Sequence, residues 1–188
     1  MTDQPTGLSA ALLRQANELG FECQGQAPAA RLEVNPEVRS MCAADRCQSY
    51  GKNWMCPPAC GDLDEFAAGL ARHADCVIVQ TVAELEDEFD VEGMMEAEAL
   101  HKRRFAALAR FARETAQSQG LPAPLPLAAG TCTLCPTCTC PDEPCRNPES
   151  ALVSMEAAGL LVSDACEAAH IPYYHGKGTM AYTSCVLV

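Results

Sequence analysis

The chain has 188 residues with a formal net charge of −12 at pH 7, and 48% of its residues are apolar. This size and composition predict a single domain spanning residues 1–188, because the apolar share is large enough to form a buried core. The negative charge argues against a nucleic-acid-binding protein, since contacts to phosphate require a basic surface. The sequence also has no apolar stretch near the ~18–20 residues that a membrane-spanning helix needs.

The 13 cysteines must be assigned either to disulfides or to metal. Small secreted proteins reach a similar density through disulfides. However, residues 1–20 have neither a basic start nor a continuous apolar segment, so they do not resemble a signal peptide. The odd number of cysteines and their C-x2-C spacings suit metal binding better than a disulfide framework. We therefore expect a cytoplasmic, cysteine-rich metal-binding protein.

The N-terminal half predicts two helices around a first cysteine loop. Apolar residues recur with a helical period over residues 8–19, which predicts a short helix. A short strand is possible over residues 31–34. The cysteine loop 42–60 follows, and its Pro, Gly and Asn content disfavours regular structure. Asp62 and Glu65 form a capping-box pattern that opens a second helix, which we expect to end near residue 73.

The middle of the chain predicts a βαβ unit over residues 76–129. Residues 76–82 form an apolar, β-branched run typical of a buried strand. Residues 91–119 have the helical period of a long amphipathic helix, and residues 125–129 read as a second strand. The cysteine loop 132–145 directly follows that strand, where open α/β sheets usually place their ligands.

The C-terminal part predicts a helical pair and a final strand over residues 147–188. Asn147 and Pro148 favour a helix start, and this helix is expected to reach residue 158. A second helix over residues 163–170 and a strand over residues 179–188 complete the chain. The predicted fold class is α/β, with α+β as the alternative: a small mixed sheet with flanking helices and cysteine-rich metal-binding loops.

The second cysteine group has a spacing typical of iron–sulfur proteins. A C-x2-C-x2-C run supplies three thiolates to one face of a cubane 4Fe–4S cluster, and a more distant cysteine closes the site. The four candidate ligands are Cys132, Cys135, Cys138 and Cys145. The helix expected from Asn147 would point its positive end toward these thiolates. Structural zinc is the alternative, because four thiolates also satisfy tetrahedral zinc. Cys140 is either an alternative fourth ligand or a spare thiol beside the site.

The first cysteine group matches no single common motif. Its members are Cys42, Cys47, Cys56 and Cys60, separated by four, eight and three residues. They are candidates for a second cluster or a zinc ion, or they complete one shared site with the second group. If Cys60 is not a ligand, the site has an open corner for a small substrate or a sulfur species.

Other candidates carry less information. Four cysteines stand alone: Cys23, Cys76, Cys166 and Cys185. Cys76 and Cys185 lie in predicted apolar strands and Cys166 in a predicted helix, so these three are expected to be ordinary buried residues. Trp54 is expected to pack over a cluster, and Lys52 is either a neutralising charge or a solvated loop residue. His101 is expected on the surface of the long helix. The segment 84–98 contains eight acids and no basic residue, and it is either a solvated loop or a docking face for a basic redox partner.

The order of motifs resembles a family of uncharacterised prokaryotic proteins, domain of unknown function 2284, which are described as predicted metal-binding proteins. The matching pieces are YGKNWMCPP from Tyr50, AGTCTLCPTC from Ala129, CRNPES from Cys145 and SMEAAG from Ser154. The resemblance implies a cysteine-bound metal. It places seven cysteines on the family's positions: Cys42, Cys47, Cys56, Cys132, Cys135, Cys138 and Cys145. Cys60 and Cys140 lie outside those positions, and the family name implies no reaction.

Three functions remain open from the sequence. The first is a redox or electron-transfer protein that holds one or two cubane clusters. The second is an iron–sulfur enzyme in which an open cluster corner acts on a small molecule. The third is a zinc-stabilised interaction module without redox chemistry.

Overall fold

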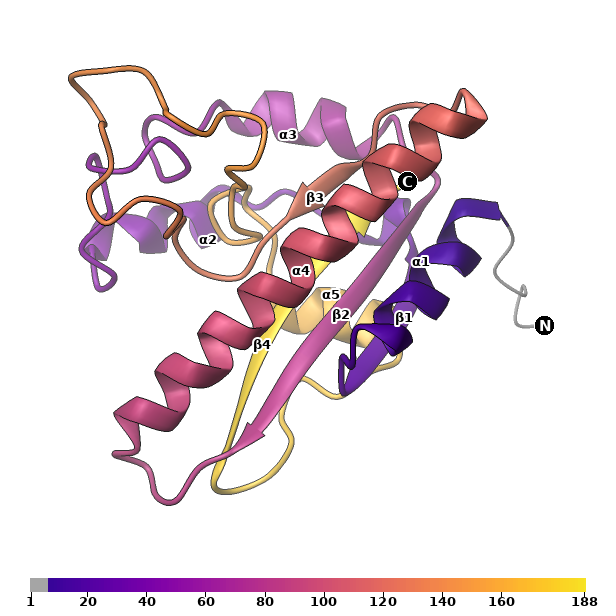
Figure 1. Cartoon of the computed structure of the whole chain (residues 1–188). Helices are drawn as coiled ribbons and strands as arrows, with labels where there is room; N and C mark the ends of the chain where they lie inside the picture. Colours follow the sequence, from indigo (N-terminus) through magenta and orange to yellow (C-terminus); the bar gives the residue numbers. More distant parts are fainter. Residues whose placement is uncertain (1–6) are drawn as a thin grey trace.

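The computed structural model describes residues 7–188, and within this range five α-helices accompany one four-stranded sheet (Figure 1). The helices are α1 (Gly7–Glu18), α2 (Pro36–Ser40), α3 (Leu63–Leu70), α4 (Val91–Gln119) and α5 (Val162–Ala168). The strands are β1 (Cys23–Pro28), β2 (Asp75–Glu84), β3 (Leu125–Leu127) and β4 (Thr179–Leu187). The predicted fold class of helices on a small sheet, with cysteine-rich loops, is confirmed. Residues 1–6, which belong to the segment tested for a signal peptide, lie outside the described residues.

The sheet has the strand order β1-β2-β4-β3, and every neighbouring pair is antiparallel. Both strands of the predicted βαβ unit, β2 and β3, belong to this sheet, which was expected to be mixed. The two strands are parallel to each other, as a crossover through α4 requires, but β4 lies between them. The C-terminal strand takes this central place because its nine residues pair along almost the whole of β2.

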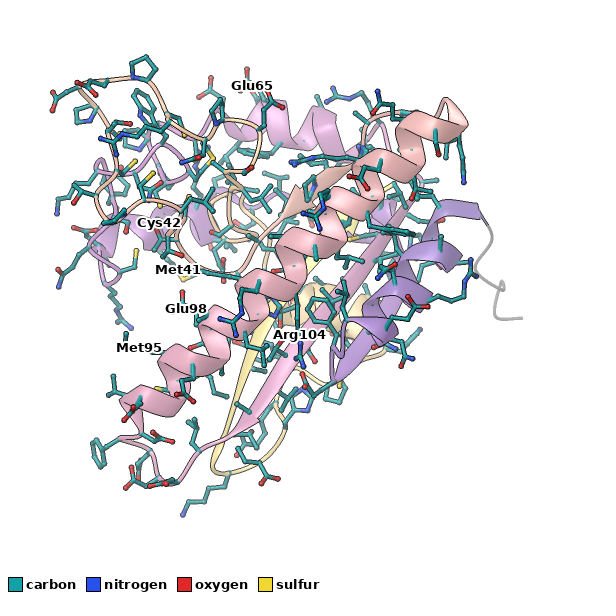
Figure 2. All side chains as sticks on the ribbon, in the orientation of Figure 1. Met41, Cys42, Glu65, Met95, Glu98 and Arg104 are labelled. Atoms are coloured by element: carbon teal, nitrogen blue, oxygen red, sulfur yellow. The ribbon has the colours of Figure 1, made fainter. Side chains whose placement is uncertain are left out.

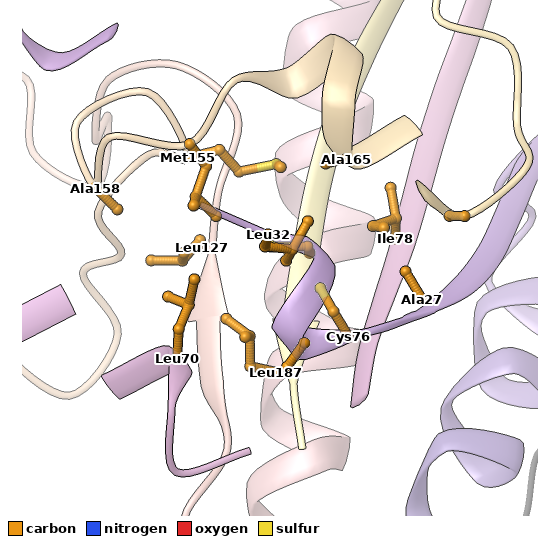
Figure 3. Packing of buried hydrophobic residues seen from close by; sticks show 14 residues of the cluster. Ala27, Leu32, Leu70, Cys76, Ile78, Leu127, Met155, Ala158, Ala165 and Leu187 are labelled. Atoms are coloured by element: carbon orange, nitrogen blue, oxygen red, sulfur yellow. The ribbon is translucent and has the colours of Figure 1, made fainter. Parts of the chain in front are cut away.

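Alternating side chains of the central strands form two hydrophobic layers, one on each face of the sheet. On one face, Val77, Val79 and Val186 pack against α1 and α4, which lie side by side in Figure 1. On the other face, Ile78 and Leu187 pack with residues of α5 and of the segment that precedes it (Figure 3). The apolar run predicted as a buried strand is therefore buried on both faces.

The helix boundaries follow from local capping. The side chain of Asp90 accepts a hydrogen bond from the Gly93 amide at the start of α4, and Gly120 ends this helix with a positive φ of 66°. Asp62 and Glu65 form the predicted capping box at α3, although this helix stops at Leu70, three residues earlier than expected. Among the described residues, no helix is long and apolar enough to cross a membrane.

Two sequence predictions fail in segments where the chain pairs with distant residues. The strand lies at Cys23–Pro28 and not at residues 31–34, which belong partly to a 3-10 turn (Ala29–Arg31). The residues of β1 are largely polar, so they lack the apolar pattern that predicts a strand. Its Gly25 is required because a Cβ there would lie 2.5 Å from the carbonyl oxygen of Ala169.

The helix expected over residues 147–158 is absent. Asn147 closes only one turn, in which its carbonyl accepts from the Ala151 amide at 2.8 Å. The following backbone then pairs with the chain just after β3: Ala128 donates to Val153 at 2.8 Å and accepts from Met155 at 3.0 Å. These hydrogen bonds consume the groups that would otherwise continue the helix.

Candidate metal centre

The two cysteine loops lie together beside the end of the sheet that carries β3, on the left of Figure 1, and sulfur atoms are visible among the loops around Cys42 in Figure 2. Asn53 joins them. Its side-chain amide donates to the carbonyl of Cys132 at 2.9 Å and to the hydroxyl of Thr131 at 3.3 Å, and its oxygen accepts from the Met55 amide at 3.0 Å. Only 7% of Asn53 is exposed. The loops are therefore held against each other by a buried polar side chain.

All four candidate ligands of the second group line one cavity of about 440 Å³: Cys132, Cys135, Cys138 and Cys145. Cys140 does not line it, and its sulfur lies 4.0 Å from the carbonyl of Gly51. The cavity wall includes the basic side chains of Lys52 and Arg146 and contains no acidic residue. Trp54 also lines it and donates to the carbonyl of Glu143 at 2.9 Å. A protein of net charge −12 thus offers two cations and four thiols to this one cavity.

Hydrogen-bond donors already point at sulfur atoms of the second group. The Asn147 side-chain amide donates to the Cys135 sulfur at 3.2 Å, so Asn147 serves the site through its side chain and not as the start of a long helix. Burial raises the pKa of the Cys132 thiol, and the neighbouring cysteines raise it further, while the Leu134 amide opposes this shift. Such N–H···S contacts are among the features that set the reduction potential of iron–sulfur clusters.

The first group lines a separate cavity of about 180 Å³, but only in part. Cys42, Cys47 and Cys56 contribute to its wall, together with Thr131 and Glu156. The Cys56 sulfur lies 3.3 Å from the hydroxyl of Thr131. Burial raises the pKa of the Cys56 thiol to about 11.

Cys60 does not line this cavity, and its sulfur contacts Arg39. The Arg39 guanidinium lies 2.7 Å from the Cys60 sulfur, donates also to the carbonyl of Gly61, and lies over the ring of Phe66. Cys60 is close enough for its charge to raise the pKa of Cys42, yet it is absent from the cavity wall.

The remaining cysteines are separate from both cavities. Cys76, Cys166 and Cys185 are buried as predicted, and Cys23 is half-buried. All 13 cysteines are free thiols. Among the described residues, no three cysteine, histidine or acidic side chains gather tightly enough to hold a single ion.

His101 is a core residue, and the prediction of a surface histidine is wrong. It is fully buried, with its ring nitrogens 3.1 Å from the Thr81 hydroxyl and 2.7 Å from the Ser184 hydroxyl. Burial lowers its pKa to about 3, with smaller contributions from Arg104 and Lys102. The sequence offers little sign that His101 lies on the buried face of α4, because three basic residues follow it directly.

Sequence reasoning assigned no role to three polar residues beside the two cavities: Asn53, Thr131 and Glu156. Each lies within a motif that carried the family resemblance, namely YGKNWMCPP, AGTCTLCPTC or SMEAAG. For Asn53 and Thr131, a polar side chain within three residues of a cysteine was the only available signal, and Glu156 has no cysteine near it in the sequence. Nothing in the spacing showed that these three segments would meet.

The fold and the two thiol-lined cavities define a cysteine-rich protein of the metal-binding class. The chain belongs to the family described as predicted metal-binding protein, domain of unknown function 2284, which it matches over residues 26–188. No curated protein and no solved structure matches the chain.

Proposed function

We propose that this protein is a cytoplasmic iron–sulfur protein that transfers electrons. In this proposal Cys132, Cys135, Cys138 and Cys145 hold a 4Fe–4S cluster, which supplies reversible one-electron redox chemistry. The first group holds a second metal through Cys42, Cys47 and Cys56. The odd number of cysteines and their C-x2-C spacings, which suit metal binding better than disulfides, support a reducing compartment such as the cytoplasm.

One observation carries the proposal: residues 131–150 contain no buried residue. A segment of this length without a core has no apolar burial to offset the entropy of ordering it. The wall of the 440 Å³ cavity supplies four thiols that a metal would cross-link. A bound metal therefore provides the stabilisation that the side chains do not.

The spacing of the cysteines on this cavity favours a cluster over a single ion. Its C-x2-C-x2-C loop with a remote fourth cysteine has the order used around cubane clusters. Four thiolates also satisfy tetrahedral zinc, so metal and sulfide counting must separate the two.

The contact between the two cavities supports electron transfer between them. Thr131 touches the Cys56 sulfur at 3.3 Å and is bonded directly to Cys132 in the chain. Asn53 adds a hydrogen bond to the Cys132 carbonyl. The two groups are thus connected through one side chain and one peptide unit. A shared single site is disfavoured, since the groups line different cavities.

Anaerobic purification followed by iron, zinc and acid-labile sulfide counting tests the proposal. We expect about four irons and four sulfides for each cubane cluster. A Cys135→Ser variant should lose the second-group cluster, whereas Cys23→Ser, which alters a cysteine outside both cavities, should retain it. A protein that contains zinc alone, without sulfide, would contradict both redox functions and favour a zinc-stabilised interaction module.

A second function, an iron–sulfur enzyme, is favoured by the position of Cys60. Because Arg39 holds this thiol outside the cavity, the first group offers three cysteines to its metal and leaves one corner without a thiolate. A metal with a free corner can bind a small molecule directly. A Cys60→Ser variant should keep its full metal content if this arrangement persists, and lose metal if Cys60 is a ligand.

We also propose that the acidic segment 84–98 receives a basic redox partner. Phe89 and Met95 are exposed on it, and its end reaches the cysteine loops through Glu98, which pairs with Lys102, a donor to the Thr131 carbonyl. A basic c-type cytochrome serves as the probe. Reversing the charge of Glu86 and Glu88 to lysine should slow its reduction and flatten its salt dependence, whereas Glu114→Lys should not. Equal rates in all variants would contradict this surface.

A further inference from the structure

The cavity of about 180 Å³ beside the first cysteine group has one carboxylate in its wall, that of Glu156. The same wall contains Cys42, Cys47 and Cys56. Among the described residues, Glu156 has no ion-pair partner. Its charge is therefore available to a cation bound by the thiols.

The backbone around Glu156 is rigidly held. The turn that carries it is closed by hydrogen bonds from Gly159 to Glu156 at 2.9 Å and from Leu160 to Met155 at 2.8 Å. Gly159 has a φ of +84°, and an added Cβ would meet Leu63 and Val34 at 3.0 Å. The turn is thus fixed by left-handed backbone geometry and by close packing on both sides.

The neighbours of Glu156 point into the protein. Met155, Ala157, Ala158 and Leu160 are all buried at 2% exposure or less, and the Met155 and Ala158 side chains lie in the core of Figure 3. Glu156 is the only residue from 155 to 160 that is not buried. The core contacts of its neighbours therefore leave its side chain at the cavity.

We infer that Glu156, and not Cys60, is the fourth protein ligand of the first site, which makes this site a three-thiolate, one-carboxylate centre. The inference rests on the proposed metal binding by Cys42, Cys47 and Cys56. Arg39 removes Cys60 from the wall, and the rigid turn supplies an oxygen donor instead. Iron and zinc both accept carboxylate oxygen as well as thiolate sulfur. A carboxylate is the ligand more readily exchanged for an incoming anion or thiolate, so it gives this site an exchangeable position.

Cobalt titration of the whole metal-free protein tests this ligand set independently of activity. Co²⁺ reports each bound thiolate by its charge-transfer absorption. We expect Glu156→Gln to retain the thiolate bands of the first site but to bind Co²⁺ at least about tenfold more weakly. Cys60→Ser should match the wild type in both measurements, and Cys56→Ser should lose thiolate absorption. Glu114→Gln, an exposed change on α4, is the matched control.

A Glu156→Asp variant separates ligation from folding. It keeps the carboxylate one methylene shorter, so it should bind Co²⁺ more tightly than Glu156→Gln while both show wild-type circular dichroism. The inference is overturned if Cys60→Ser weakens binding and Glu156→Gln does not. It is also overturned if both variants bind as the wild type does. Iron and sulfide counts on the same preparations are a separate readout: zinc without sulfide would contradict the proposed redox function and leave the cobalt result to decide the role of Glu156.

Discussion

The sheet and the cysteine loops are stabilised by different means. The central strands are covered on both faces, and residues such as Leu12, Ile78 and Leu127 have no exposed surface. In the loops, residues 131–150 bury nothing, and residues 41–61 bury only three positions. The sheet therefore has its own hydrophobic core, whereas the loops depend on a few polar contacts and on ligation. Metal binding and folding should therefore be separable in the sheet and coupled in the loops.

Removing the metal should have the largest effect, and it should be confined to the loops. After chelation, or in Cys135→Ser, we expect cleavage by protease within residues 131–150 to become at least about tenfold faster, because ligation provides the order of that segment. The strands should retain their hydrogen-exchange protection. Mass spectrometry of the fragments measures both. Loss of protection throughout β2 and β4 would contradict the separation.

A cavity in the core of the sheet should destabilise the fold without releasing the metal. Leu127→Ala removes a fully buried side chain of β3 and should lower the free energy of unfolding by roughly 2–5 kcal/mol. The metal content of the folded fraction should stay at the wild-type value. Denaturant unfolding of the metal-loaded protein, with metal counted in parallel, gives both quantities. A folded protein without metal would show that the core and the loops form one cooperative unit.

His101 should make the stability of the sheet and its core depend on pH. Its folded pKa of about 3 lies below the ordinary value of 6.5, so between these values the unfolded chain binds a proton that the folded chain excludes. Its contribution to stability is complete above pH 6.5 and is lost as the pH falls toward 3. His101→Phe should abolish this slope and cost roughly 1–3 kcal/mol at neutral pH, since Thr81 and Ser184 lose their partner.

Urea unfolding at several pH values measures the slope, and His170→Asn, a change at an exposed histidine, is the control. An unchanged slope in His101→Phe would show that other groups carry the pH dependence.

The smallest effect is expected from the contact that joins the two loops. Asn53→Ala removes hydrogen bonds to Thr131 and Cys132 and should destabilise the loop pair by about 1–2 kcal/mol. Both sites should still load metal, but proteolysis of both loops should accelerate. Arg46→Ala, an exposed change in the first loop, provides the comparison. Equal protection in the two variants would mean that the loops are ordered independently.

The sequence by itself determined the elements that depend on local patterns. The period of α4, the apolar run of β2 and the capping box of α3 were all predicted, because each is written in consecutive residues. The two cysteine groups and the family were recognised in the same way, from spacing and motif order. Local chemistry fixes such features regardless of what packs against them.

Only the tertiary structure decided how these parts meet. It inserted β4 between β2 and β3, buried His101, and replaced the expected helix after Asn147 by pairing with Ala128. It also turned Cys60 toward Arg39 and brought Glu156 to the first cysteine cavity. Each outcome depends on contacts between residues far apart in the chain, and their free energy has no signature in the local sequence. The cysteine ligands could be proposed from the sequence, but the oxygen donor beside them could not.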